Sequence, residues 1–400
     1  MKKIISVLVL FICLISGCSC NKDEAVRTSI FSSYVFGYKN KTDDTPVMVD
    51  PFGSYISIVG YNEKKVKSVQ DKLNELAAKY HSLLDRNYYY KDDEGTVINN
   101  LKVINDSYGT GEAIVVDPII IEALSEGVKY SKLSNGNFNI VSGTLVDLWD
   151  ISISYTHVDP SESLVNQAVQ CVPSVDEIDE VLVIDNVNNT VKFNIVDGCE
   201  GNASITLGAM AKSYFLDKLI GMDSFSKIGS AIYDAGQSSI ILKGDNPLRE
   251  GGYWNIAVND SLNSNVFFAS QAAKLQLEGT SAISTSGGEY KGYINDEGVR
   301  RHHIIDAKSG YPNSFVVGCT VVGSSAMIMD IVSTTIMTME SLEEVKDYLV
   351  LLDNNGIQVD VLLQVPVSSS TIKIYVSEGM EGKVSEVYNN IEIEVFEYGA

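Results

Sequence analysis

The sequence predicts a globular protein of the α+β class, in which helices and strands are mixed. Short runs of alternating apolar residues are typical of half-buried strands, and other apolar residues recur at spacings of three and four, which is typical of helices with one buried face. The two patterns follow one another along the chain without a short repeat or a low-complexity block. Hydrophobic residues make up 45% of the 400 positions, so the chain can bury a sizeable core.

The first residues have the pattern of a secretory leader. Lys2 and Lys3 precede an apolar run from Ile4 to Ile15, which is too short to span a bilayer. The sequence Ile-Ser-Gly-Cys that ends at Cys18 resembles a bacterial lipobox. We therefore expect residues 1–17 to be a lipoprotein signal peptide, and Cys18 to be a lipidated, palmitate-bearing N-terminus. An ordinary cleaved signal is the alternative.

Such an anchor would hold the protein on the extracytoplasmic face of the cell membrane. Residues 18–45 are polar and lack periodicity, and we expect them to form a tether. The chain has a net charge of −22 and a pI near 4.5. This charge excludes nucleic acid as a partner and disfavours binding to anionic lipid, so the lipid anchor alone must hold the chain to the membrane.

The cysteines give no evidence of a metal site. Cys13 leaves with the signal and Cys18 is expected to carry lipid, and the other four cysteines are widely scattered. No CxxC spacing remains after the leader, which argues against a thiolate zinc site.

The elements begin with a strand and two helices. Alternation predicts a strand at residues 55–59, and apolar positions from Val66 to Leu84 predict one helix. Asp117 and Pro118 begin a second helix, because Asp caps the first turn and Pro fits it. That helix is expected to end at Asn135-Gly136.

A hairpin and further elements follow. The runs 182–184 and 191–195 flank Asn188-Asn189, a turn signal. A helix is expected after Gly208, and strands at 239–242 and 254–258.

The last part of the sequence alternates between helix and strand signals. A strongly apolar helix is expected over residues 324–339. A helix at 342–351 and strands at 359–365 and 371–376 follow. We expect residues 46–340 to form the main domain and residues 341–400 to form an α/β extension packed on it.

The helix at 324–339 contains one charge, Asp330. A carboxylate among Met, Ile and Val is costly to bury unless it is paired or binds a cation. Ser333 and Thr334 follow at three and four residues, so the three side chains share one helical face. Oxygen ligands of this kind suit Mg²⁺. The alternative is that Asp330 caps a loop or pairs with a distant Lys or Arg.

Residues 205–219 form a possible anion site. A strand that ends at Thr206-Leu207-Gly208 would be followed directly by a helix. The first turn of that helix would then have free backbone N–H groups. Lys212 lies one turn inside that helix and could reach the same phosphate. A Gly-capped amphipathic helix without a ligand is the alternative.

The stretch RRHHIIDAKSGYP, residues 300–312, contains two adjacent histidines before an aspartate. A histidine held by an acid can accept a proton from a hydroxyl near neutral pH. In a strand, His302 and His303 would point to opposite faces, and alternation does not say which one faces the site. Upstream, Ser286 lies in a Gly-containing stretch, and Phe138 and Trp149 could stack on a flat ring or could pack in the core.

The order of these motifs resembles that of the ApbE family, the FAD:protein FMN transferases. The motifs are a G-x-F bend followed by G-x-L and Trp, then L-G-A-x-A-K, T-S-G, H-x-I-D-x-x-S-G-x-P and A-M-x-x-D-x-x-S-T, and the match runs from about residue 47 to 339. The resemblance implies a T-fold-related architecture of antiparallel sheets packed by helices, with the active site in a cleft between two lobes. It also implies Mg²⁺-dependent cleavage of FAD, transfer of FMN to a Ser or Thr in the flavinylation motif of an acceptor protein, and release of AMP.

The resemblance also implies roles for particular residues. The metal would be held by the carbonyl of Ala209, by Asp330 and by Thr334, with Ser333 adjacent. His303 would be the base, with Asp306 orienting it or supporting the metal, and Lys212 would meet the FAD phosphates. The remaining residues expected to line the FAD site are Phe52, Gly53, Asn137, Phe138, Asn139, Thr206, Ser286 and Ile305.

Four positions depart from the family pattern. Thr206 and Asn139 stand where Asp is usual, Ala307 where Pro is common and Gln237 where Gly is common. The loss of two carboxylates could weaken nucleotide recognition or metal affinity. Two alternatives therefore remain open: an FAD pyrophosphatase that gives FMN and AMP, and a non-catalytic surface lipoprotein that binds flavin.

Overall fold

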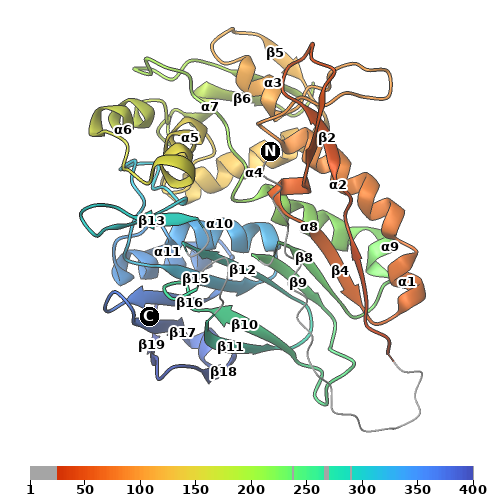
Figure 1. Ribbon diagram of the computed structural model, residues 1–400, viewed down its shortest axis with the longest axis vertical. Helices are drawn as coiled ribbons and strands as arrows, with labels where there is room; N and C mark the ends of the chain where they lie inside the picture. Colours follow the sequence, from red (N-terminus) through yellow and green to blue (C-terminus); the bar gives the residue numbers. More distant parts are fainter. Residues whose placement is uncertain (1–24, 237, 265–269, 289–290, 400) are drawn as a thin grey trace.

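The computed structural model describes residues 25–236, 238–264, 270–288 and 291–399. Its largest element is a nine-stranded sheet in the lower half of Figure 1. In spatial order the strands are β1 (Thr28–Phe31), β4 (Ile56–Gly60), β8 (Ala231–Ala235), β9 (Ser239–Lys243), β12 (Ser281–Gly287), β15 (Gly318–Gly323), β16 (Asp360–Pro366), β17 (Ile372–Ser377) and β19 (Glu392–Phe396). Neighbouring strands are antiparallel except for β17 and β19, which are parallel.

The central sheet is buried on both faces. Successive residues of a strand point to opposite sides, so Ala282 and Ile283 of β12 belong to two different hydrophobic clusters. Val321 and Val322 of β15 divide in the same way. These middle strands therefore hold two layers together, whereas the edge strands β1 and β19 are largely exposed.

One face of the sheet is covered by helices. These are α2 (Gln70–Leu84), α8 (Ala211–Gly221), α10 (Ala326–Ile336) and α11 (Leu342–Asn354), whose buried residues belong to one cluster with this face of the sheet. In Figure 1, α8 and α10 lie side by side, with α8 above β8 and β9 and α10 above β12 and β15. The opposite face is covered by a three-stranded sheet of β10 (Trp254–Asn259), β11 (Gln271–Leu277) and β18 (Val384–Val387).

A second lobe lies at the top of Figure 1. Its antiparallel sheet has the order β5 (Ala113–Val115), β7 (Thr190–Phe193) and β6 (Leu182–Asp185). The helices of this lobe are α3 (Leu101–Asp106), α4 (Pro118–Leu133), α5 (Gly143–Ile151), α6 (Glu162–Val169) and α7 (Ile178–Val181). A disulfide between Cys171 and Cys199, which the sequence analysis did not foresee, joins two of its loops.

The remaining elements are short. They are β2 (Val35–Tyr38), β3 (Pro46–Val49), η1 (Pro51–Gly53), α1 (Glu63–Lys67), the π-helix η2 (Ser152–Thr156), α9 (Asp223–Ser226), β13 (Gly292–Ile294), β14 (Arg300–His302) and α12 (Glu378–Glu381). No helix in the described ranges is long and apolar enough to cross a membrane.

Most predicted elements are confirmed, and so is the mixed α and β fold with antiparallel sheets. The Asp117 side chain caps α4 by accepting from the backbone N–H of Ile119 at 2.9 Å, as its position before Pro118 predicted. Asn189 has a left-handed φ of 51° in the turn of the predicted β6–β7 hairpin, a conformation that Asn tolerates.

Three predictions differ from the structure. The single helix expected from Val66 to Leu84 is two helices, because Val69 has a non-helical ψ of 5°. The tether expected over residues 18–45 extends too far, because β1 joins the central sheet through pairs such as Ile30 with Ile58. The strand expected before Gly208 is an extended segment without a named strand.

The expected extension at residues 341–400 supplies α11 and three strands of the central sheet, and so shares its core. The leader, Cys18 and Gln237 lie outside the described residues.

Candidate active site

The buried carboxylate of Asp330 is held by three donors. Its side chain is 4% exposed. Oδ2 accepts from Nζ of Lys212 and from Oγ of Ser213, both at 2.8 Å, and Oδ1 accepts from Oγ of Ser284 at 3.0 Å. The structure therefore shows the ion pair with a distant lysine that the sequence left open as an alternative. The same pair brings together two residues predicted to share one site.

A second acid fixes α8 against α10. Asp217 accepts from Oγ of Ser325 at 2.7 Å and from the backbone N–H groups of Ala326 and Met327 at 2.8 and 3.0 Å. It thus satisfies the free donors at the start of α10. Burial raises the pKa of Asp217, while these hydrogen bonds oppose that shift. Asp217 was not predicted from the sequence, although it lies one turn after Ser213 on α8.

The predicted hydroxyl face of α10 meets strand β12. Oγ of Ser286 lies 2.8 Å from Oγ of Ser333 and 3.4 Å from Oγ1 of Thr334. Ser333 is fully buried and also donates to the backbone carbonyl of Asp330 at 3.1 Å. Thr334 is partly exposed, so the hydroxyl layer leads from the buried carboxylate towards the surface.

A tight turn starts α8. The N–H groups of Met210 and Ala211 bond to the carbonyl of Leu207 at 3.0 and 2.8 Å. Thr206 donates its N–H to the carbonyl of Ile140 at 2.7 Å, and its Oγ1 accepts from the N–H of Gly208 at 3.4 Å. The Thr206 hydroxyl is therefore used within its own turn.

Ala209, between Gly208 and Met210, is partly exposed in this turn. The turn lies two residues before Lys212, as the resemblance implied.

The two histidines have different surroundings. His302 is 1% exposed; its Nε2 lies 2.7 Å from the carbonyl of Asn313, and its Nδ1 accepts from the N–H of Ile304 at 3.2 Å. Nδ1 is thus the unprotonated nitrogen and Nε2 the donor. Burial lowers the pKa of His302 to about 4.

His303 points the other way and is exposed to solvent. Desolvation by the protein around the ring, then the neighbouring His302 ring and the ammonium groups of Lys291 and Lys212, hold the pKa of His303 well below the ordinary value, although the ring still reaches solvent. His303 is therefore neutral at pH 7.

Asp306 does not orient His303 in this structure. Its Oδ1 accepts from the N–H of Lys308 at 3.1 Å and its Oδ2 from the N–H of Ser309 at 2.9 Å. Asp306 and His303 both lie within the described residues, and the Asp306 carboxylate forms no hydrogen bond with the His303 ring. Its observed role is to close the Ser-Gly-Tyr-Pro turn, an arrangement that Asp often makes with amides two residues ahead.

Phe52 adopts a strained backbone conformation beside α8. Its φ is 57°, which is rare for a bulky residue. Its N–H donates to Nδ1 of His81 at 3.1 Å, and its ring stacks on Phe215 of α8 at 5.4 Å. Tyr90 lies 2.9 Å from Nε2 of His81, and this histidine was missed by the sequence analysis. Gly53, with φ 70°, is exposed beside it.

The residues expected around the flavin pack mainly inside the protein. Phe138 is 7% exposed and belongs to the main core, so its ring presents no open face. Asn139 donates to the carbonyl of Pro173 at 2.9 Å and accepts from the N–H of Val141 at 2.9 Å. Asn137 donates to Thr338 at 3.2 Å.

Trp149, the other candidate for stacking on a ring, is fully buried. Ile305, the remaining residue expected at the FAD site, packs against the cluster that contains Trp149.

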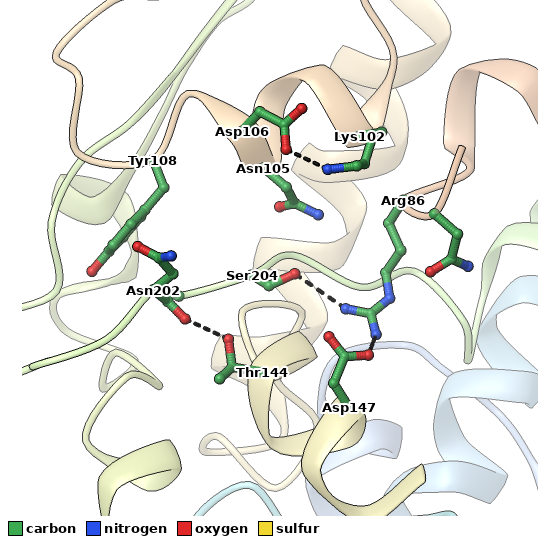
Figure 2. Close-up of a pocket in the computed structure, with 11 residues that line it drawn as sticks. Arg86, Lys102, Asn105, Asp106, Tyr108, Thr144, Asp147, Asn202 and Ser204 are labelled. Atoms are coloured by element: carbon green, nitrogen blue, oxygen red, sulfur yellow. Dashed lines mark hydrogen bonds and ion pairs between the residues drawn. The ribbon is translucent and has the colours of Figure 1, made fainter. Parts of the chain in front are cut away.

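A polar pocket of about 610 Å³ lies in the second lobe (Figure 2). Arg86 donates to Oγ of Ser204 at 3.1 Å and pairs with Asp147. Asn105 exchanges two hydrogen bonds with the backbone of Ile205, at 2.8 and 3.0 Å. None of the predicted site residues lines this pocket. Residues 202–204, which line the pocket, belong to the segment that continues through Thr206 into α8.

Known proteins resemble this chain over most of its length. The model of the ApbE family matches residues 52–359. An FAD:protein FMN transferase of Vibrio cholerae is 25% identical over 276 residues, which is 68% of this chain and 74% of the relative. One from Treponema pallidum is 24% identical over 247 residues, 59% of this chain and 65% of the relative, so the chain spans slightly less than two thirds of that relative.

Solved structures show the same fold. The flavin transferase ApbE from Vibrio cholerae superposes with a TM-score of 0.63 at 22% identity, covering 90% of this chain and 100% of the other. The ApbE protein from Thermotoga maritima gives a TM-score of 0.63 at 23% identity, covering 84% and 97%. Because the family model spans well over half of the sequence, the chain belongs to the ApbE family.

Proposed function

We propose that this protein is a transferase that moves FMN from FAD to a Ser or Thr hydroxyl of an acceptor protein and releases AMP. Membership of the ApbE family and relatives that are FAD:protein FMN transferases support the flavin chemistry. The observation that carries the proposal is the buried Asp330 carboxylate, which bonds to Lys212 beside a layer of hydroxyl groups.

The residues of the site fit a magnesium ion. No group of three or more His, Cys, Asp or Glu side chains in the described ranges could hold a metal, so a thiolate or imidazole site is not built here. One carboxylate with hydroxyl and carbonyl oxygens is instead the ligand set with which Mg²⁺ binds a substrate phosphate. The ammonium of Lys212 places a positive charge at this carboxylate, which supports the proposal of a cation there. Asp330, Thr334 and the carbonyl of Ala209 would hold the ion, with Ser333 adjacent.

Each group then has a part in phosphoryl transfer. The acceptor oxygen forms a bond to the phosphorus of the FMN half of FAD, the anhydride P–O bond breaks, and AMP leaves. His303, neutral and exposed, accepts the proton of the attacking hydroxyl, and Lys212 contacts the phosphates. A bound Mg²⁺ would supply neutralisation of the pyrophosphate charge.

The N-terminal anchor belongs to the same proposal. Lipidation at Cys18 would hold the enzyme on the extracytoplasmic face of the cell membrane, and the acceptor protein would be reached there. The lipobox sequence supports this placement.

The test is direct. The full chain is incubated with FAD, Mg²⁺ and an acceptor bearing a Ser/Thr flavinylation motif, and covalent FMN is followed by in-gel fluorescence and mass spectrometry. An FMN adduct and equimolar AMP are expected with Mg²⁺ and not with EDTA. Turnover of FAD to free FMN and AMP without any acceptor would favour the pyrophosphatase alternative, which the solvent exposure of His303 also supports. Flavin binding without turnover would leave the non-catalytic alternative.

A further inference from the structure

His303 lies in the sequence between the β13–β14 hairpin and the turn that Asp306 closes. The β13–β14 hairpin ends at His302, and the turn closed by Asp306 begins three residues after His303. Both units are attached to one segment of the second lobe, residues 149–159. In Figure 1 this segment, which begins in the last turn of α5, lies above β13.

Asp159 attaches the hairpin. Its Oδ1 accepts from the hydroxyl of Tyr293 at 2.6 Å, and its Oδ2 accepts from Nδ2 of Asn295 at 3.0 Å and from Nε of Arg301 at 2.9 Å. Nη2 of Arg301 also lies 2.8 Å from Oδ2. Asp159 and Arg301 are 23% and 15% exposed, so these bonds are partly shielded from water. The hydrogen bonds from Arg301, Tyr293 and Asn295 hold the pKa of Asp159 below its ordinary value, against the effect of burial.

Trp149 attaches the turn. Its Nε1 donates to the carbonyl of Gly310 at 2.8 Å, and its ring meets Tyr311 edge-on at 5.7 Å. The guanidinium of Arg301 lies over both rings, 5.7 Å from the centre of Trp149 and 5.5 Å from that of Tyr311. Arg301 therefore contacts both Asp159, which holds the hairpin, and the Trp149 and Tyr311 rings, which hold the turn.

The segment that carries Asp159 has unusual backbone geometry. The helix α5 runs into the π-helix η2, and His157, just after it, has a left-handed φ of 55°. The His157 ring then stacks on Tyr293 at 5.8 Å with an interplanar angle of 16°. π-Helical turns and left-handed non-glycine residues are often found at functional sites.

We infer that Asp159 is a positioning residue, which fixes the β13–β14 hairpin and thereby the direction of the His303 ring that follows it. This inference rests on the proposed function. Asp159 lies on a different lobe from Asp330, and its contacts are made two residues before His303 rather than with the histidine itself. Its contribution is therefore geometric, because it holds the base in place without touching the reacting atoms.

The kinetic test uses Asp159→Asn in the full chain. A misplaced base slows the chemical step by up to about 100-fold, so we expect kcat for FMN transfer to fall 10- to 100-fold. The dissociation constant for FAD should stay within about twofold of the wild-type value. The matched control is Asp360→Asn, which removes a carboxylate of similar exposure (28%) from its pair with Lys383 in the C-terminal part of the sheet. The control should leave kcat unchanged.

A second measurement does not depend on activity. The four histidines are labelled with ¹³C at Cε1, and the titration of His303 is followed by NMR, with a His303→Gln variant for assignment. Release of the hairpin would reduce desolvation of the ring and raise the pKa of His303. Loss of the Asp159 charge alone would shift it in the opposite direction, because a nearby anion favours the imidazolium. A rise in Asp159→Asn supports the inference, and an unchanged or lowered pKa overturns it.

Failure of the inference and failure of the proposed function are separable. If the wild-type chain transfers no FMN, the proposed function fails and the NMR titration alone decides the role of Asp159. If the wild-type chain is active and Asp159→Asn lowers only the melting temperature, with kcat and the His303 titration unchanged, Asp159 merely stabilises the fold and the inference is wrong.

Discussion

Nζ of Lys212 lies 2.8 Å from Oδ2 of Asp330, and this contact joins two helices that are 118 residues apart in sequence. The resemblance assigned the two residues different ligands, FAD phosphate for the lysine and a metal ion for the carboxylate. Their direct pairing means that Lys212 must leave Asp330 before the carboxylate can bind an ion with that oxygen. A buried carboxylate is costly without a counter-charge. Binding of the metal ion by Asp330 and movement of Lys212 to the FAD phosphates should therefore be coupled.

Replacing Lys212 with Met should separate metal binding from FAD binding. Without the ammonium, Asp330 is open to a divalent ion, so Mn²⁺ affinity in the absence of FAD should rise about 10-fold, corresponding to about 1.4 kcal/mol, while FAD affinity falls. Isothermal titration of Mn²⁺ with and without FAD measures both. Lys218→Met is the matched control, since Lys218 lies on the same helix and pairs with the distant Glu122. Unchanged Mn²⁺ affinity in Lys212→Met would show that the two cations do not compete.

Removing the imidazole in His303→Gln should slow FMN transfer about 100- to 10,000-fold, because a general base is lost, while FAD affinity stays within about twofold. A base must be neutral to act, and the pKa of His303 lies below its ordinary value. The kcat/KM of the wild type should therefore stay level as the pH falls from 8 to about 5, and decline only as the pH approaches that lowered pKa. A titration of kcat/KM near pH 6.5 would contradict this assignment.

The stability of the fold should depend on the ionisation of His302. Its folded pKa of about 4 lies below the unfolded value of 6.5, so the unfolded chain binds the proton first. Stability is therefore complete above pH 6.5 and is lost as the pH falls towards 4, by up to about 3 kcal/mol. Urea unfolding of the wild type and of His302→Gln at pH 7.5 and pH 5 gives the loss in free energy of unfolding between the two pH values for each protein. The wild type should lose more stability than the variant, and an equal loss would assign the effect to other groups.

The disulfide of the second lobe should stabilise the protein without serving the site. It joins Cys171 and Cys199 across a sequence separation of 28 residues, and closing a loop of that size contributes about 2–4 kcal/mol. The double variant with serine at both positions should show a lower free energy of unfolding and unchanged kcat. Substitution of the buried free thiol Cys319 by Ala is the comparison for a cysteine that closes no loop. If the double variant is fully folded but has a lower kcat, the disulfide also supports the geometry of the active site.

Local features of the fold could be predicted from the sequence. Asp117 before Pro118 predicted a capped helix, because capping depends on neighbouring atoms only. Asp330, Ser333 and Thr334 were expected on one face, because helical spacing alone fixes that relationship. The break at Val69 was missed, since apolar spacing continues through it and hides the change in backbone direction.

Contacts between distant segments could not be read from the sequence. Nothing in the spacing of Lys212 shows that it pairs with Asp330, and nothing in the scattered cysteines shows that Cys171 meets Cys199. The direction of His303 was open because alternation gives opposite faces without naming the inner one. The inner face was decided by the carbonyl of Asn313, which receives Nε2 of His302.

Among the described strands, β19 forms one edge of the central sheet. Glu392 and Glu394 lie along it, and both pair with Lys373 of β17. Open strand edges invite pairing with other chains, and charged side chains there oppose it. Two such edges from separate molecules would bring four carboxylates and only two lysines together, so the excess negative charge should oppose association of this edge with a second copy.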